Sequence, residues 1–150
     1  MDPLSITAAV VGLTATSIQT AKALYSIKDK FQGAALTIAA IYTETTIISA
    51  SLSKLQSSLL SNREELADNL SRRPDLEATL DQALTGCFVV LDVLQAEVGK
   101  LTEACQTDSL NITLKARLRF VWNESTMQDI LKQLRGIQTA MSLLLQLLGT

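Results

Sequence analysis

Residues 34–60 read AALTIAAIYTETTIISASLSKLQSSLL, and this stretch decides the fold class. Its apolar residues recur in alternating steps of three and four, which is the period of a helix face that packs against another helix. Glu44 is the only charged residue between Lys30 and Lys54, so we expect a second neighbouring helix beyond the first. The buried seam is predicted to comprise Ile38, Ile41, Thr45, Ile48, Leu52, Leu55 and Leu59.

Two later segments repeat this pattern. Pro74 opens a predicted helix that runs to about Cys105, and the acidic residues near its start suit the helix dipole. Its core stripe is predicted as Leu76, Leu80, Leu84, Cys87, Leu91, Leu94, Val98, Leu101 and Cys105. The last helix is predicted to begin at Ser125, because residues 125–128 have the capping-box pattern. Its seam is Met127, Ile130, Leu134, Ile137, Met141, Leu144 and Leu148.

The segments between these helices are short and polar. Residues 61–73 form a polar break in which Leu66 and Leu70 support one amphipathic turn, and residues 113–122 form a short helix before the last one. No strand pattern competes with the helical periods. We therefore expect an all-α protein: a single domain over residues 1–150, built as an antiparallel bundle of four long helices with one short helix before the last.

The first long helix is unusual because residues 3–21 carry no charge. Asp2 can cap this helix and Pro3 fits its first turn. Its many Ser and Thr residues make it less apolar than a solitary membrane span. Such a helix is expected to be buried in protein, transferred to a membrane, or both at different times. Since the last helix is also uncharged after Arg135, we expect the two to pack together.

Composition argues against enzymatic chemistry. The chain has no histidine, and its six glycines are isolated, so the common nucleophile triads, zinc sites and phosphate loops are excluded. Cys87 and Cys105 lie five turns apart on one predicted helix, which prevents a disulfide between them. A formal net charge of −2 gives no field that would attract nucleic acid. We expect no catalytic residue, no cofactor and no metal.

One basic cluster stands out in the short helix. Lys115, Arg117 and Arg119 occur with no acidic residue between Asp108 and Glu124. They predict contact with anionic lipid headgroups or an acidic partner, and the alternative is a solvated helix face.

Two segments together resemble a known family. The opening MDPLSITAAVVGL (residues 1–13) and the block KARLRFVW (115–122) resemble the fungal N-terminal domain of STAND proteins, the HeLo-like group at the front of many fungal NOD-like receptors. The resemblance continues through Leu131, Leu134, Gln138, Met141, Leu143, Leu144, Leu145 and Gln146.

The resemblance implies a signalling domain that self-associates and precedes a nucleotide-binding module in the same polypeptide. It further implies action in programmed cell death or heterokaryon incompatibility, in the cytoplasm and then at the plasma membrane on activation. On that basis the residues that act at membranes and in oligomerisation are Leu4, Ile6, Val10, Val11, Gly12, Leu13, Thr16 and Ile18.

Two other functions stay open from sequence. One is a helical adaptor that binds a partner helix without touching membranes. The other is an extracellular helical carrier for a lipid, which a cleaved leader or glycans on Asn69 or Asn111 would support.

Overall fold

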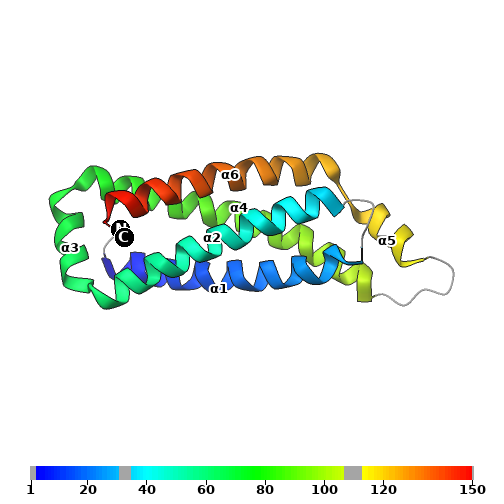
Figure 1. Cartoon of the computed structure of the whole chain (residues 1–150), viewed down its shortest axis with the longest axis horizontal. Coiled ribbons are helices and arrows are strands. Elements are labelled where there is room, and N and C mark those ends of the chain that lie inside the picture. The colour runs from blue at the N-terminus through cyan, green and yellow to red at the C-terminus, as the bar shows by residue number, and fades with distance from the viewer. Residues whose placement is uncertain (1–2, 31–34, 107–112, 150) are drawn as a thin grey trace.

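The computed structural model describes residues 3–30, 35–106 and 113–149, and these form six α-helices (Figure 1). The helices are α1 (Pro3–Lys28), α2 (Ala35–Ser61), α3 (Arg63–Arg72), α4 (Pro74–Gln106), α5 (Leu114–Val121) and α6 (Glu124–Leu147). No strand is present in these ranges. The all-α bundle with a short helix before the last is therefore confirmed.

The four long helices occupy the corners of an elongated bundle. Helix α1 packs against α2 and α4, and α6 packs against the same two helices from the other side. Consecutive long helices run in opposite directions, so α1 and α4 are parallel, as are α2 and α6 (Figure 1). Helix α2 thus has two large neighbours, which explains why its outer face carries so little charge.

Helix α3 makes a crossover that the sequence pattern did not reveal. It covers 10 residues, about 15 Å of helix, and lies across one end of the bundle (Figure 1). Neighbouring helix axes are about 9 Å apart and diagonal ones about 13 Å, so α3 is long enough to lead the chain from α2 to the opposite corner. Leu66 and Leu70 anchor it in the core. The segment that was predicted to form one amphipathic turn is instead a complete helix of 10 residues.

This crossover also overturns one expected contact. Because α4 lies beside α1, the uncharged end of α6 lies diagonally across from the N-terminal helix rather than against it. Among the described residues, α1 has its extensive contacts with α2 and α4.

The core follows the predicted seams closely. All seven seam residues of α2 are buried. The α4 stripe is buried as far as Leu101, and there Ala104 is buried in place of the half-buried Cys105. A straight helix drifts against a seven-residue repeat, so the seam shifts over 33 residues. In α6, Ile137 and Leu148 pack at the edge of the core and the other five predicted residues are buried.

The N-termini of α5 and α6 are each fixed by a side-chain cap. Thr113 caps α5 by accepting a hydrogen bond from the Ala116 N–H. Asn123, rather than the predicted Ser125, caps α6 and accepts from the Thr126 N–H at 3.0 Å. Asn is a cap residue as good as Ser and stands at the extended position just before the helix, so Ser125 falls inside its first turn.

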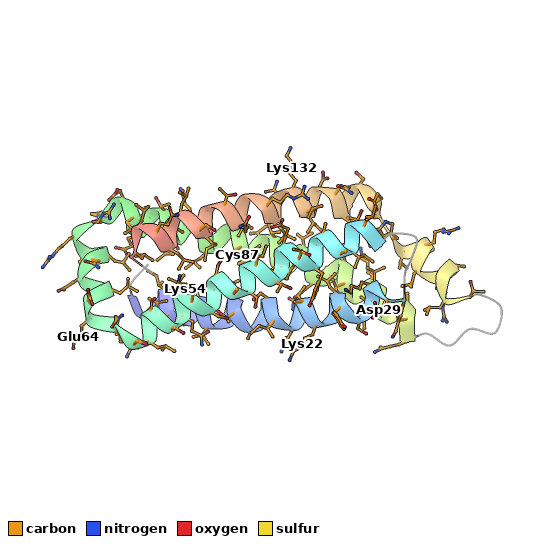
Figure 2. The ribbon with its side chains drawn as sticks, in the orientation of Figure 1. Lys22, Asp29, Lys54, Glu64, Cys87 and Lys132 are labelled. Carbon is orange, nitrogen blue, oxygen red and sulfur yellow. The ribbon has the colours of Figure 1, made fainter. Side chains whose placement is uncertain are left out.

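The two cysteines are free and both lie on α4. Figure 2 shows the Cys87 side chain in the interior, while the charged groups of Lys22, Glu64 and Lys132 point away from the bundle. Burial raises the pKa of the Cys87 thiol to about 11. This thiol acts as a small core residue, because little thiolate forms at neutral pH.

Thr45 carries a buried polar atom that lacks a partner. The side chain is completely buried in the α2 seam, and its Oγ1 makes no hydrogen bond. We expect Thr45→Val to raise the free energy of unfolding by about 1–2 kcal/mol, since it removes an unsatisfied hydroxyl at nearly constant volume. Urea denaturation would measure this. The control is Thr46→Val on the same helix, whose exposed hydroxyl donates to the Tyr42 carbonyl at 2.8 Å. An equal change in both variants would show that the Thr45 hydroxyl is satisfied.

Candidate functional site

Helix α1 divides the predicted functional residues between two environments. Ile6, Val10 and Leu13 are buried against the bundle. Val11 and Ile18 are 42% and 38% exposed, one above the other on the outer face. The side chain of Leu4 lies outside the described residues. The predicted group is therefore not a single surface: three of its members hold the helix in place, and two face solvent.

Three buried hydroxyls of α1 are satisfied within α1 itself. Thr14 donates to the Val10 carbonyl at 2.7 Å, Ser17 to the Thr14 carbonyl at 2.9 Å, and Thr20 to the Thr16 carbonyl at 2.8 Å. Such bonds to the preceding turn are typical of Ser and Thr within helices. These three polar groups would keep their hydrogen bonds if α1 moved away from the bundle.

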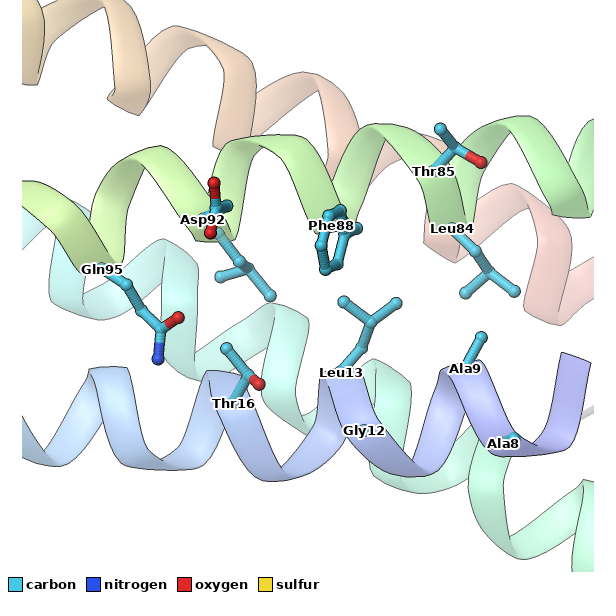
Figure 3. A pocket seen from close by; sticks show the side chains of 11 residues that line it. Ala8, Ala9, Gly12, Leu13, Thr16, Leu84, Thr85, Phe88, Asp92 and Gln95 are labelled. Atoms are coloured by element: carbon cyan, nitrogen blue, oxygen red, sulfur yellow. The ribbon is translucent and has the colours of Figure 1, made fainter.

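An open groove separates the outer edges of α1 and α4 (Figure 3). It has a volume of about 410 Å³. Phe88 of α4 and Leu13 of α1 point toward one another across it, and Gln95 reaches from α4 toward Thr16 (Figure 3). We call it the α1–α4 groove; its lining is Ala8, Ala9, Gly12, Leu13, Thr16, Leu84, Thr85, Phe88, Leu91, Asp92 and Gln95.

Small side chains keep this groove open. Ala8, Gly12 and Thr16 follow one another along the rim of α1, and a Cβ atom placed on Gly12 would meet no atom within 4 Å. The spacing of the small residues is visible in the sequence. Their partners Phe88, Asp92 and Gln95 were missed, because only the crossover through α3 places α4 beside α1.

The C-terminal half of α1 is joined to α2 by aromatic contacts. The rings of Tyr25 and Tyr42 lie 5.7 Å apart between centroids. The Lys28 ammonium lies over both rings, at 4.9 Å from the Tyr25 centroid and 5.3 Å from that of Tyr42. Cation–π contacts of this kind stabilise an exposed site by about 0.5–1 kcal/mol each. They fix the end of α1 that is remote from Ile6.

The predicted basic cluster does not form one surface. Arg119 is exposed in the last turn of α5, whereas Arg117 is half-buried with its Nε and Nη1 atoms enclosed and without hydrogen-bond partners. Lys115 belongs to α5, and its side chain lies outside the described residues. Of the two described arginines, Arg119 offers its charge to solvent.

Helices α2 and α6 are joined by a polar network centred on Glu124. Thr37 donates to its Oε1 at 2.7 Å, Gln128 donates to Oε1 at 2.9 Å, and the Trp122 indole donates to Oε2 at 2.6 Å. Farther along the same pair of helices, Arg135 and Glu44 lie 3.7 Å apart. The hydrogen bonds from Gln128, then Thr37 and Trp122, lower the pKa of Glu124 below its ordinary value.

This lowered pKa makes stability depend on pH. A carboxyl group whose pKa is lower in the folded state stabilises the fold above its unfolded pKa, and that contribution is lost as the pH falls through the folded value. We expect Glu124→Gln to melt at a lower temperature than the parent at neutral pH, and the difference to shrink as the pH falls below the ordinary pKa range of a glutamate. Thermal melts across this range would measure it, with exposed Glu65→Gln as the control. A difference that stays constant with pH would contradict the proposed cause.

The described residues contain no group of three or more His, Cys, Asp or Glu side chains placed to hold a metal ion. Within the same part of the chain, no helix has both the length and the apolar character needed to cross a membrane.

The class of protein that the fold defines is an all-α bundle of four long helices with two short ones. Comparisons of the chain with protein-family models, with curated proteins and with solved structures gave no match.

Proposed function

We propose that this chain is a non-enzymatic signalling domain that self-associates and acts on anionic membranes through α1. The observation that carries the proposal is the hydrogen bonding of α1. Thr14, Ser17 and Thr20 all donate to carbonyls of their own helix, so a move to a new environment leaves these bonds intact. Buried polar groups that lose their partners would otherwise oppose the move strongly.

Energetics favour a switch that clustering triggers. Releasing α1 from its start as far as Thr20 would expose the buried apolar residues Ile6, Val10 and Leu13, which are at most 6% exposed in the bundle. Each such side chain stabilises the docked state by about 1.5–3 kcal/mol, or about 5–9 kcal/mol for the three. A free-energy difference of about 5 kcal/mol between the docked and released states already keeps the released form below about one molecule in a thousand. The isolated domain would therefore keep α1 docked, and several helices brought together would share a new interface.

The helix also has the two faces that a shared membrane assembly needs. Val11 and Ile18 lie on its outer side, and Thr16 and Thr20 on another. In a ring of released helices, the first pair would face lipid and the threonines would line a polar interior. Arg119 of α5, whose side chain is exposed, would contact anionic headgroups.

The resemblance to the HeLo-like domains of fungal NOD-like receptors supports this role. It supplies the biological setting of the proposal: innate immunity, programmed cell death or heterokaryon incompatibility, with a nucleotide-binding module in the same polypeptide driving oligomerisation. The domain would be cytoplasmic at rest and move to the plasma membrane on activation.

Dye release from anionic liposomes tests the proposal. The isolated domain is compared with the same domain fused to a protein that forces oligomerisation. We expect leakage only from the clustered form, with neutral liposomes responding less. A folded, clustered domain that releases no dye from either kind of liposome would refute membrane action.

A helical adaptor is the second candidate, because α4 displays apolar side chains to solvent. Phe88, Val89 and Val93 are 61%, 53% and 43% exposed. A face of this kind suits the apolar side of a partner helix. Specific binding of a purified receptor segment, together with no leakage on clustering, would favour the adaptor.

A further inference from the structure

The lining of the α1–α4 groove is polarised along its length. At the end near Ala9 and Leu84 its walls are mainly apolar, and in the middle Phe88 and Leu13 face one another (Figure 3). Gln95 and Thr16 lie toward the other end, and the exposed Asp92 stands on the outer side of α4 there (Figure 3). From Ala8 to Thr16 the groove follows about 12 Å of helix. Its shape and polarity therefore suit an amphiphile with one chain and one small head.

The charge of the lining selects the head group. Among the residues that the structure describes, Asp92 is the only charged one that lines the groove, and it has no ion pair. A cationic head at this end would have a carboxylate, an amide oxygen and a hydroxyl in the lining, and each can accept a hydrogen bond from it. An anionic head would meet the same carboxylate with no cation in the lining to compensate.

We propose that the α1–α4 groove binds a single-chain amphiphile whose head is a protonated amine. The alkyl chain lies between Leu13 and Phe88, and the ammonium group lies at the end formed by Thr16, Asp92 and Gln95. A volume of about 410 Å³ falls within the usual range of small-molecule sites. Binding at this site does not depend on membrane action by the domain, so the two proposals stand or fall separately.

Decylamine is the probe, and decanoate and decanol are its matched controls, since all three carry the same chain. Titration calorimetry on the full chain is expected to give decylamine at least tenfold tighter binding than decanoate, with decanol between them. Amide chemical shifts are expected to move along residues 8–16 and 84–95. Equal binding of amine and carboxylate would overturn the proposal, and so would shifts confined to other helices.

Two variants locate the site. Asp92→Asn is expected to remove most of the preference for the amine, whereas Asp81→Asn on the same helix, outside the lining, should leave it unchanged.

Gly12→Leu is expected to weaken the binding of all three probes at least tenfold by filling the groove, and Gly136→Leu on α6 is its control. Circular dichroism verifies that each variant is folded. Decylamine binding that survives Gly12→Leu in a folded protein would overturn the proposal. Concentration-dependent dimers that Gly12→Leu abolishes would assign the groove to a second copy of the chain instead.

Discussion

Replacing Val11 or Ile18 by glutamate is expected to abolish dye release by the clustered domain while the bundle stays folded. Both side chains are partly exposed in the bundle, at 42% and 38%, so a carboxylate there stays in water. Inside a bilayer, a charged residue near the centre of a helix costs about 2.5–3.5 kcal/mol. That penalty reduces insertion of each helix by roughly a hundredfold. Because a cluster must insert several helices, the loss of leakage should be complete.

The structure also supplies the control for this experiment. Ile47 on α2 is 38% exposed, as Ile18 is, but it belongs to a helix that the proposal leaves in the bundle. Clustered Ile47→Glu should therefore still release dye. Leu13 is a poor site for such a test, since it is 6% exposed and a glutamate there would disturb packing in any case. Equal loss of leakage from all three glutamate variants would count against a specific role for α1.

The seams could be predicted from sequence because they depend on spacing alone. Every seam residue of α2, from Ile38 to Leu59, is buried, and so is most of the α4 stripe. A period of three and four residues identifies which side of a helix is apolar whatever it packs against. The short helix predicted over residues 113–122 is present as α5, with Thr113 as its cap.

The arrangement of the helices could not be predicted in the same way. A polar segment such as residues 61–73 joins two helices equally well as neighbours or across a diagonal, and only the fold shows that α3 spans the diagonal. The α1–α4 groove depends on that outcome. The spacing of the small residues Gly12 and Thr16 in one wall is visible in the sequence, but nothing in the local pattern indicated that Phe88 and Asp92 would form the other wall. Likewise, Asn123 and Ser125 both satisfy the chemistry of a cap, and the backbone conformation decides between them.

Truncating Leu52 to alanine should destabilise the domain more than any other change suggested above. Leu52 is completely buried in α2, the helix that packs against both α1 and α6. Leu→Ala at such a site costs about 2–5 kcal/mol, through lost burial and the cavity left behind. This is a large part of the roughly 5–15 kcal/mol that stabilises a typical domain.

Leu60 offers the same substitution on the same helix in a different environment. Its side chain is 57% exposed, so Leu60→Ala should change the free energy of unfolding by less than about 0.5 kcal/mol. Urea denaturation followed by far-UV circular dichroism would measure both variants. Equal slopes of the free energy of unfolding against urea concentration would show that the two expose the same surface on unfolding. The difference between them isolates the contribution of burial, because helix propensity and side-chain chemistry cancel. Equal losses in the two variants would mean that α2 does not pack through the seam containing Leu52.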